Sequence, residues 1–156
     1  MNTCYAMSLI SLGMFLVMLS QSFLSFNFFN ASPMSFLILT SIIYLFTETL
    51  IIFFFVGTGV SVRDYSADHR LPPEFHRRSI AIKRRVYPPQ LLNILILITA
   101  FVLFGAADTH KVSVWMYRLA LLFGIAHFIY AKIIQHHCFR DNTNIILEMS
   151  GLKKIS

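Results

Sequence analysis

The sequence predicts an all-α integral membrane protein: a bundle of four transmembrane helices with a basic cytoplasmic loop between helices 2 and 3. Three observations lead to this fold class. The chain has 156 residues, the size of one domain. Its composition is 56% hydrophobic and 13% charged, whereas soluble domains have about 25% charged residues. Four long apolar runs alternate with links of unequal charge, and lipid can surround apolar surface that so small a soluble protein could not bury.

Each apolar run is long enough for a membrane-spanning helix, which needs about 20 residues. The whole chain, 1–156, is predicted to be one membrane domain, with spans at residues 5–26, 33–60, 89–107 and 112–134. The first run lacks a basic stretch before it and exceeds the apolar part of a typical signal peptide, so we expect a retained span. Cleavage of this run is the alternative and would leave three spans.

The second span has recognisable signals at both ends. Ser32 is a predicted N-cap, and Pro33 suits the first turn, where a missing N–H group costs nothing. At the other end, Gly57 and Gly59 flank Thr58, and a Gly-rich stretch of this kind is expected to loosen the helix into a loop. The predicted loop covers residues 61–88.

Two features of that loop predict local structure. Residues 74–85 suit a short basic helix that lies on the lipid headgroups. Pro88 and Pro89 then suit the first turn of the third helix.

The charges of the links predict how the chain is threaded. The links at residues 27–32 and 108–111 contain a single Lys between them, whereas the tail at residues 135–156 adds further basic residues. The loop contrasts Asp64, Asp68 and Glu74 with a larger set of cations: Arg63, Arg70, Arg77, Arg78, Lys83, Arg84 and Arg85. Because cytoplasmic links carry the excess of Lys and Arg, both termini are predicted to be cytoplasmic.

Five of these cations gather in the second half of the loop. They are Arg77, Arg78, Lys83, Arg84 and Arg85. We expect them to contact anionic lipid headgroups or a partner subunit, because basic groups beside a membrane span attract anionic lipids.

Glu48 is the only acidic residue within the predicted spans. A carboxylate at mid-membrane costs about 2.5–3.5 kcal/mol, so it is rarely without a partner. Counting 1.5 Å per residue places Glu48 about 18 Å, and His127 about 10 Å, from the cytoplasmic ends of their spans. We therefore predict an intramembrane polar pair between Glu48 and His127. Glu48 could handle protons or bind a cation, or its carboxyl group could simply form a hydrogen bond between helices.

The fourth span has a stripe of small residues that predicts a helix–helix contact. The stripe consists of Ser113, Ala120, Gly124 and Ala131, with His127 in the same row. Small residues allow helix backbones to approach closely in a membrane.

At the outer face, Arg118 lies just inside the fourth span, and Asp108 ends the third. The two are predicted to form an ion pair that joins these spans.

No motif points to a cofactor, a metal or catalysis. His127 is the only histidine inside a span, so a two-histidine haem held by this chain alone is not expected. The spacing of His136, His137 and Cys138 matches no zinc pattern. Phosphate loops, nucleophile elbows and paired catalytic carboxylates are missing. These observations favour a non-catalytic protein without a metal or cofactor, and no nucleic-acid-binding motif is present.

Three functions remain as hypotheses. The first is an accessory or structural subunit, or an assembly factor, of a larger membrane protein complex, with other integral membrane subunits and anionic lipids as partners. The second is a small proton-coupled transporter that uses Glu48 and acts as a homo-oligomer. The third is a subunit of a redox complex that contributes His127 to a haem or quinone site. The expected location is a bacterial inner membrane.

Overall fold

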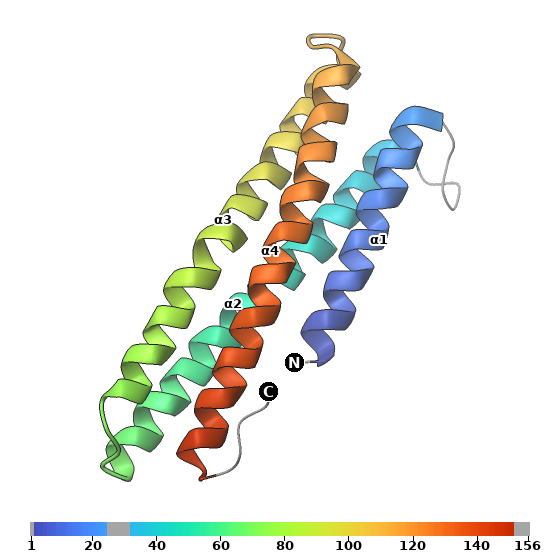
Figure 1. Ribbon diagram of the computed structural model, residues 1–156. Coiled ribbons are helices and arrows are strands. Elements are labelled where there is room, and N and C mark those ends of the chain that lie inside the picture. The colour runs from blue at the N-terminus through green and yellow to red at the C-terminus, as the bar shows by residue number, and fades with distance from the viewer. Residues whose placement is uncertain (1, 25–31, 152–156) are drawn as a thin grey trace.

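The computed structural model is a bundle of four antiparallel helices that run up and down along one axis (Figure 1). It describes residues 2–24 and 32–151. The helices are α1 (Asn2–Leu24), α2 (Pro33–Asp68), α3 (Glu74–Asp108) and α4 (Val114–Met149). Each is long and apolar enough to cross a membrane. The all-α fold and the four candidate transmembrane helices are therefore confirmed, and the chain has the features of an integral membrane protein.

The helix starts follow local capping chemistry. Ser32 accepts a hydrogen bond from the backbone N–H of Ser35 at 3.2 Å, and Pro33 occupies the first turn of α2. Ser113 caps α4 in the same way, by accepting a bond from the N–H of Trp115 at 3.4 Å. These side chains satisfy N–H groups that have no partner inside the helix.

The predicted loosening of α2 at Gly57 and Gly59 is wrong. The helix continues to Asp68, about three turns further. A Cβ atom on Gly59 would lie 2.2 Å from Cε and Nζ of Lys83. The glycine therefore permits the Lys83 side chain to cross α2 closely, and it does not break the helix.

The predicted loop between the second and third spans is also mostly helical. Residues 74–85 belong to α3 and pack in the bundle, so they do not form a separate helix on the headgroups. Pro88 and Pro89 lie inside α3, where they leave the carbonyl groups four residues earlier without a helical N–H donor. Only residues 69–73 form the turn between α2 and α3.

A heptad pattern explains why the polar segments stay helical. Apart from Phe139, the buried residues of α4 alternate in steps of four and three and continue into its polar half: Tyr117, Leu121, Gly124, Phe128, Ala131, Gln135, Cys138, Asn142 and Ile145. This spacing is that of a coiled coil, in which one seam of each helix faces its neighbours. The polar half of α4 therefore has a buried seam of its own.

The helices differ in length, and the difference creates a projection at the lower end of the bundle. Helix α1 has 23 residues, whereas the other three have 35 or 36. At 1.5 Å per residue, those three exceed the ~30 Å hydrocarbon core by about 20 Å. Figure 1 shows α2, α3 and α4 continuing below the start of α1. We call this part, residues 57–86 and 138–149, the projection.

Two hydrophobic cores lie along the bundle axis. The upper core includes Phe15, Leu37, Tyr44, Leu97, Leu121 and Phe128. The lower core includes Cys4, Ile51, Phe55, Val86, Cys138 and Phe139. Buried polar residues occupy the level between them.

Candidate functional site

The level between the two cores is a layer of polar side chains from α2, α3 and α4. Its centre is Glu48, whose side chain is 0% exposed. The Nζ atom of Lys132 donates to Oε1 of Glu48 at 2.9 Å and to Oε1 of Gln135 at 3.0 Å. The Nε2 atom of Gln90 also donates to Oε1 of Gln135, at 3.2 Å. We call Glu48, Gln90, Asn93, Lys132 and Gln135 the polar layer.

The predicted partner of Glu48, His127, does not contact it directly. Nδ1 of His127 is hydrogen-bonded to Oδ1 of Asn93. Asn93 lies close enough to the Glu48 carboxylate to interact with it, although its Nδ2 atom makes no hydrogen bond. Asn93 therefore stands between the two residues, and the cation that pairs with Glu48 is Lys132.

Four atoms of the polar layer are buried without a hydrogen bond to any described residue. They are Oε2 of Glu48, Oε1 of Gln90, Nδ2 of Asn93 and Nε2 of Gln135. An unpaired buried polar group costs about 1–3 kcal/mol. The set contains two acceptors and two donors.

The layer lies nearer the lower end of the spans than the sequence predicts. Glu48 and Asn93 are neighbours, and the apolar run of α3 begins four residues from Asn93, at Pro89. Four residues correspond to about 6 Å along a helix. The predicted depth of Glu48, about 18 Å, is measured from Val60 as the end of the span, but Val60 lies in the projection.

Sequence reasoning missed four of the five residues of this layer. A signal was present, because Gln90 and Asn93 on α3, and Lys132 and Gln135 on α4, are each three residues apart. Residues at this spacing share a helix face. Two polar pairs at the same end of neighbouring apolar runs could therefore have suggested a shared layer.

The stripe of small residues on α4 is buried only in part. Gly124 and Ala131 are buried, and a Cβ atom on Gly124 would lie 3.2 Å from Cγ2 of Ile96 on α3. Ala120 is half-buried against the upper core. Ser113 is exposed as the N-cap and takes no part in the helix packing.

Arg118 and Asp108 are not brought together. The Arg118 guanidinium donates through Nη2 to the carbonyl oxygen of Ser22 at 2.5 Å and through Nε to the Ser22 hydroxyl at 3.2 Å. It also lies over the rings of Phe23 and Trp115, with its Cζ atom 4.6 and 5.0 Å from their centroids. Arg118 thus joins α4 to α1, and Asp108 forms no ion pair among the described residues.

The five predicted contact cations have different surroundings. Arg78 forms a two-bond ion pair with Glu148, at 2.7 and 3.2 Å, and Arg85 lies 3.8 Å from Asp141. Both pairs join α3 to α4 within the projection. Lys83 crosses Gly59, which leaves Arg77 and Arg84 as the exposed members without an ion pair to a described residue.

His136 and Cys138 have separate surroundings, in keeping with a spacing that matches no zinc pattern. Nδ1 of His136 is hydrogen-bonded to the Tyr5 hydroxyl at 2.8 Å, while Cys138 is buried in the lower core. Among the described residues, no group of three or more His, Cys, Asp or Glu side chains is placed to hold a metal ion.

The polar layer and the charged projection are thus the two candidate functional sites. Comparison with known proteins adds no relative: no family model matches the chain, and neither a curated protein nor a solved structure does.

Proposed function

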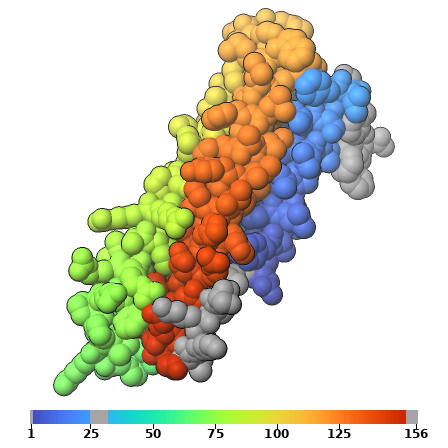
Figure 2. All heavy atoms as spheres, viewed as in Figure 1, coloured from blue at the N-terminus to red at the C-terminus, as the bar shows by residue number. Residues whose placement is uncertain are grey.

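We propose that this chain is a non-catalytic accessory subunit or assembly factor of a larger membrane complex. Its projection would lie in the cytoplasm and bind a helix of a partner subunit. The cytoplasmic placement follows from the excess of Arg and Lys at the lower end, since positive links remain on that side. Long side chains extend from this green to yellow-green part of the surface in Figure 2.

One observation carries the proposal: an apolar groove of about 250 Å³ between α2 and α4 in the projection. It is lined by Ser61, Val62, Tyr65, Ile146, Met149 and Ser150. Tyr65 is 41% and Ile146 43% exposed. These residues lie beyond the apolar runs of α2 and α4, where an exposed apolar surface indicates a binding site for another protein.

The position of the groove indicates a helix as its occupant. Higher in the bundle, α1 packs against both α2 and α4. The bond between Ser11 and Thr47 sets the register, so that the first described residue, Asn2, is level with about residue 56 of α2. The groove opens roughly two turns below this level. A partner helix would therefore occupy the position that α1 occupies within the membrane.

The polar layer supports a non-catalytic role. Glu48 is paired with Lys132 at 2.9 Å, so a cation of the protein already occupies the position that a cationic substrate would take. This favours the subunit proposal over the transporter hypothesis. The redox hypothesis stays a prediction about His127, which an absorbance spectrum of the purified protein would test.

The proposal is tested by gentle solubilisation of the native membrane and by native mass spectrometry of the purified chain. We expect the wild-type chain, of 18.0 kDa, in a larger assembly of fixed stoichiometry. Ile146→Glu should release it from that assembly, because a charge would be buried in an apolar contact. Ala67→Glu is the matched control, since Ala67 is exposed on α2 and outside the groove.

A second measurement identifies the contact itself. A photo-crosslinking amino acid in place of Tyr65 should join the chain to one partner protein, and the same group at Ala67 should not. A wild-type chain that purifies alone, or an Ile146→Glu chain that keeps the complete assembly, would refute the proposal. Circular dichroism of both variants establishes that they remain folded.

A further inference from the structure

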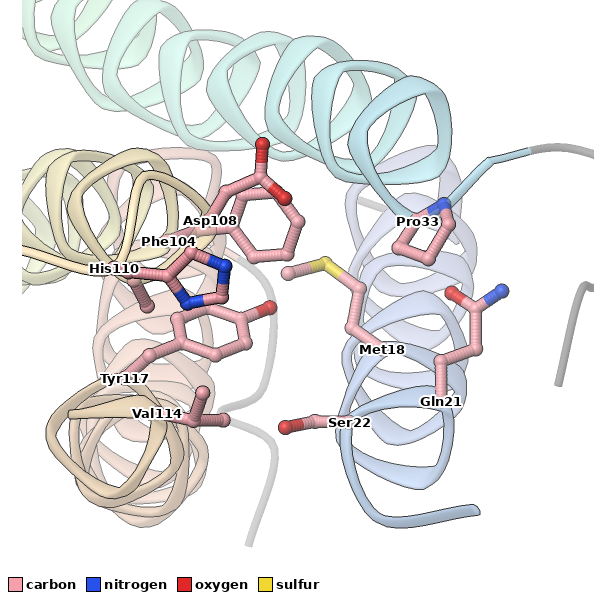
Figure 3. A pocket seen from close by; sticks show the side chains of 10 residues that line it. Met18, Gln21, Ser22, Pro33, Phe104, Asp108, His110, Val114 and Tyr117 are labelled. Carbon is pink, nitrogen blue, oxygen red and sulfur yellow. The ribbon is translucent and has the colours of Figure 1, made fainter. Parts of the chain in front are cut away.

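The upper end of the bundle contains a cavity of about 460 Å³ (Figure 3). All four helices contribute to its wall, with Met18, Gln21 and Ser22 from α1, Pro33 from α2, Phe104, Ala107 and Asp108 from α3, and Val114 and Tyr117 from α4. His110, from the α3–α4 turn, completes it. The volume lies within the range of about 300–1,000 Å³ usual for small-molecule sites.

The wall of the cavity combines apolar and polar side chains, and it includes two aromatic rings. Phe104 and Tyr117 meet edge to face, with ring centroids 5.1 Å apart. Figure 3 shows the Met18 thioether and the Tyr117 hydroxyl pointing into the space between α1 and α4. The Tyr117 hydroxyl makes no hydrogen bond to a described residue. It is therefore available to a molecule in the cavity.

Asp108 supplies the negative charge of the site. It has no ion-pair partner among the described residues, because Arg118 is bound to Ser22 and lies between two rings on α1 and α4. Arg118 is also not part of the cavity wall. Asp108 is thus the only group with a formal charge among the lining residues, apart from any charge on His110.

The backbone of the α3–α4 turn holds His110 in an unusual conformation. Its φ angle is 58°, in the left-handed region that non-glycine residues rarely adopt. The turn is closed by hydrogen bonds from the N–H groups of His110 and Lys111 to the carbonyl groups of Ala107 and Ala106, at 3.0 and 2.9 Å. Figure 3 shows the His110 ring at the edge of the cavity, near Tyr117. Arg70, which follows α2 in the same way, has a φ angle of 51°, so this conformation is a common way for a helix to end, and here it places the His110 ring beside the cavity.

We propose that this cavity binds a small organic cation that has an ammonium group and an apolar body. The ammonium group would face the Asp108 carboxylate and the Phe104 ring, beside the Tyr117 hydroxyl. Aromatic faces attract cations through their quadrupole, and quaternary ammonium groups are bound in this way. The apolar body would contact Met18 and Val114. The ammonium group can belong to a soluble molecule or to the choline headgroup of a lipid.

The first experiment uses benzyltrimethylammonium as the probe and isothermal titration calorimetry of the full chain in a maltoside detergent. We expect saturable binding to the wild-type chain and an affinity at least about tenfold lower for Asp108→Asn, which keeps the shape and removes the charge. Asp68→Asn is the matched control, because Asp68 is exposed at the opposite end of the bundle and its substitution should leave the affinity unchanged.

Phe104→Leu tests the aromatic contribution separately. It should weaken binding of the cation by several-fold while binding of benzyl alcohol, which is uncharged, changes less. Thermal unfolding of each variant establishes that it is folded. Absence of saturable binding to the wild-type chain, or equal affinity of Asp108→Asn, would overturn the proposal.

Nanodiscs distinguish the two sources of the ammonium group. If lipid headgroups fill the cavity, the probe should bind more weakly in phosphatidylcholine discs than in phosphatidylglycerol discs. Part of this difference comes from competition at the cavity, and Asp108→Asn should remove that part. If the ligand is soluble, that site-dependent difference should be absent. Asp108→Asn should leave the assembly formed through the projection intact, so this proposal can fail without the other.

Discussion

Glu48 and Lys132 show how two residues of opposite charge can be accommodated inside a membrane bundle. Each would be costly alone in hydrocarbon, but the two are joined at 2.9 Å. Lys132 also lies 4.6 Å from the centroid of the Phe128 ring, which offers its electron-rich face. Each residue therefore lowers the free-energy cost of burying the charge of the other.

Removal of one partner tests this interpretation. Lys132→Met should destabilise the folded chain by about 3–5 kcal/mol, because it leaves a buried carboxylate without its counter-charge. The double variant Glu48→Gln with Lys132→Met should recover much of that loss, since no net charge stays buried. Thermal unfolding in detergent measures both, and Lys111→Met, in the exposed turn, is the control. A single variant as stable as the wild type would contradict a close ion pair.

At the level of elements, the polar halves of α3 and α4 are held together by apolar seams and by ion pairs. Ile82 and Val86 are buried on α3, and Cys138 and Ile145 are buried on α4. The Arg78–Glu148 pair lies beside this seam. The average polarity of residues 61–88 predicts a loop, but the heptad positions within it predict a helix. The segment is helical because its apolar seam packs against neighbouring helices, and such packing supplies most of the stability of a helix.

Glu148→Gln should weaken the contact between α3 and α4 by about 0.5–1 kcal/mol, the value of a partly exposed ion pair. The hydrogen bonds that Arg78 donates to Glu148 raise the pKa of Arg78 above its ordinary value. A raised pKa of a cation contributes stability that is fully present below the unfolded-state pKa and is lost only as the pH rises through the folded-state pKa. Both values lie above the working range of pH.

The difference in unfolding temperature between wild type and Glu148→Gln should therefore be constant from pH 7 to about pH 10. It should shrink as salt is added, because exposed charges are screened. A difference that disappears as the pH rises through this range would show that the charge on Arg78 is not the partner.

The whole molecule has two ends of different character. The lower end contains the charged projection, whereas the short α3–α4 turn and the cavity lie at the upper end. Lys111 and His69 are exposed in turns at opposite ends. They provide positions from which the orientation of the bundle can be measured.

A membrane-impermeant maleimide should label Lys111→Cys in intact cells, but should label His69→Cys only after the membrane is opened. The native chain is a suitable background, because Cys4 and Cys138 are both buried. Burial also raises the pKa of the Cys138 thiol, so little reactive thiolate is present near neutral pH. The reverse labelling pattern would place the projection outside and contradict its proposed cytoplasmic location.

The sequence by itself determined that the chain forms four long apolar helices, and it located the cap at Ser32 and the need of Glu48 for a partner. These are local properties, because hydropathy and capping depend on residues close together in the chain. Only the tertiary structure decided that this partner is Lys132, that α2 continues past Gly59, and that Asp108 faces a cavity. Each of these depends on the register between helices, which side-chain packing sets and which counting along one helix does not reveal.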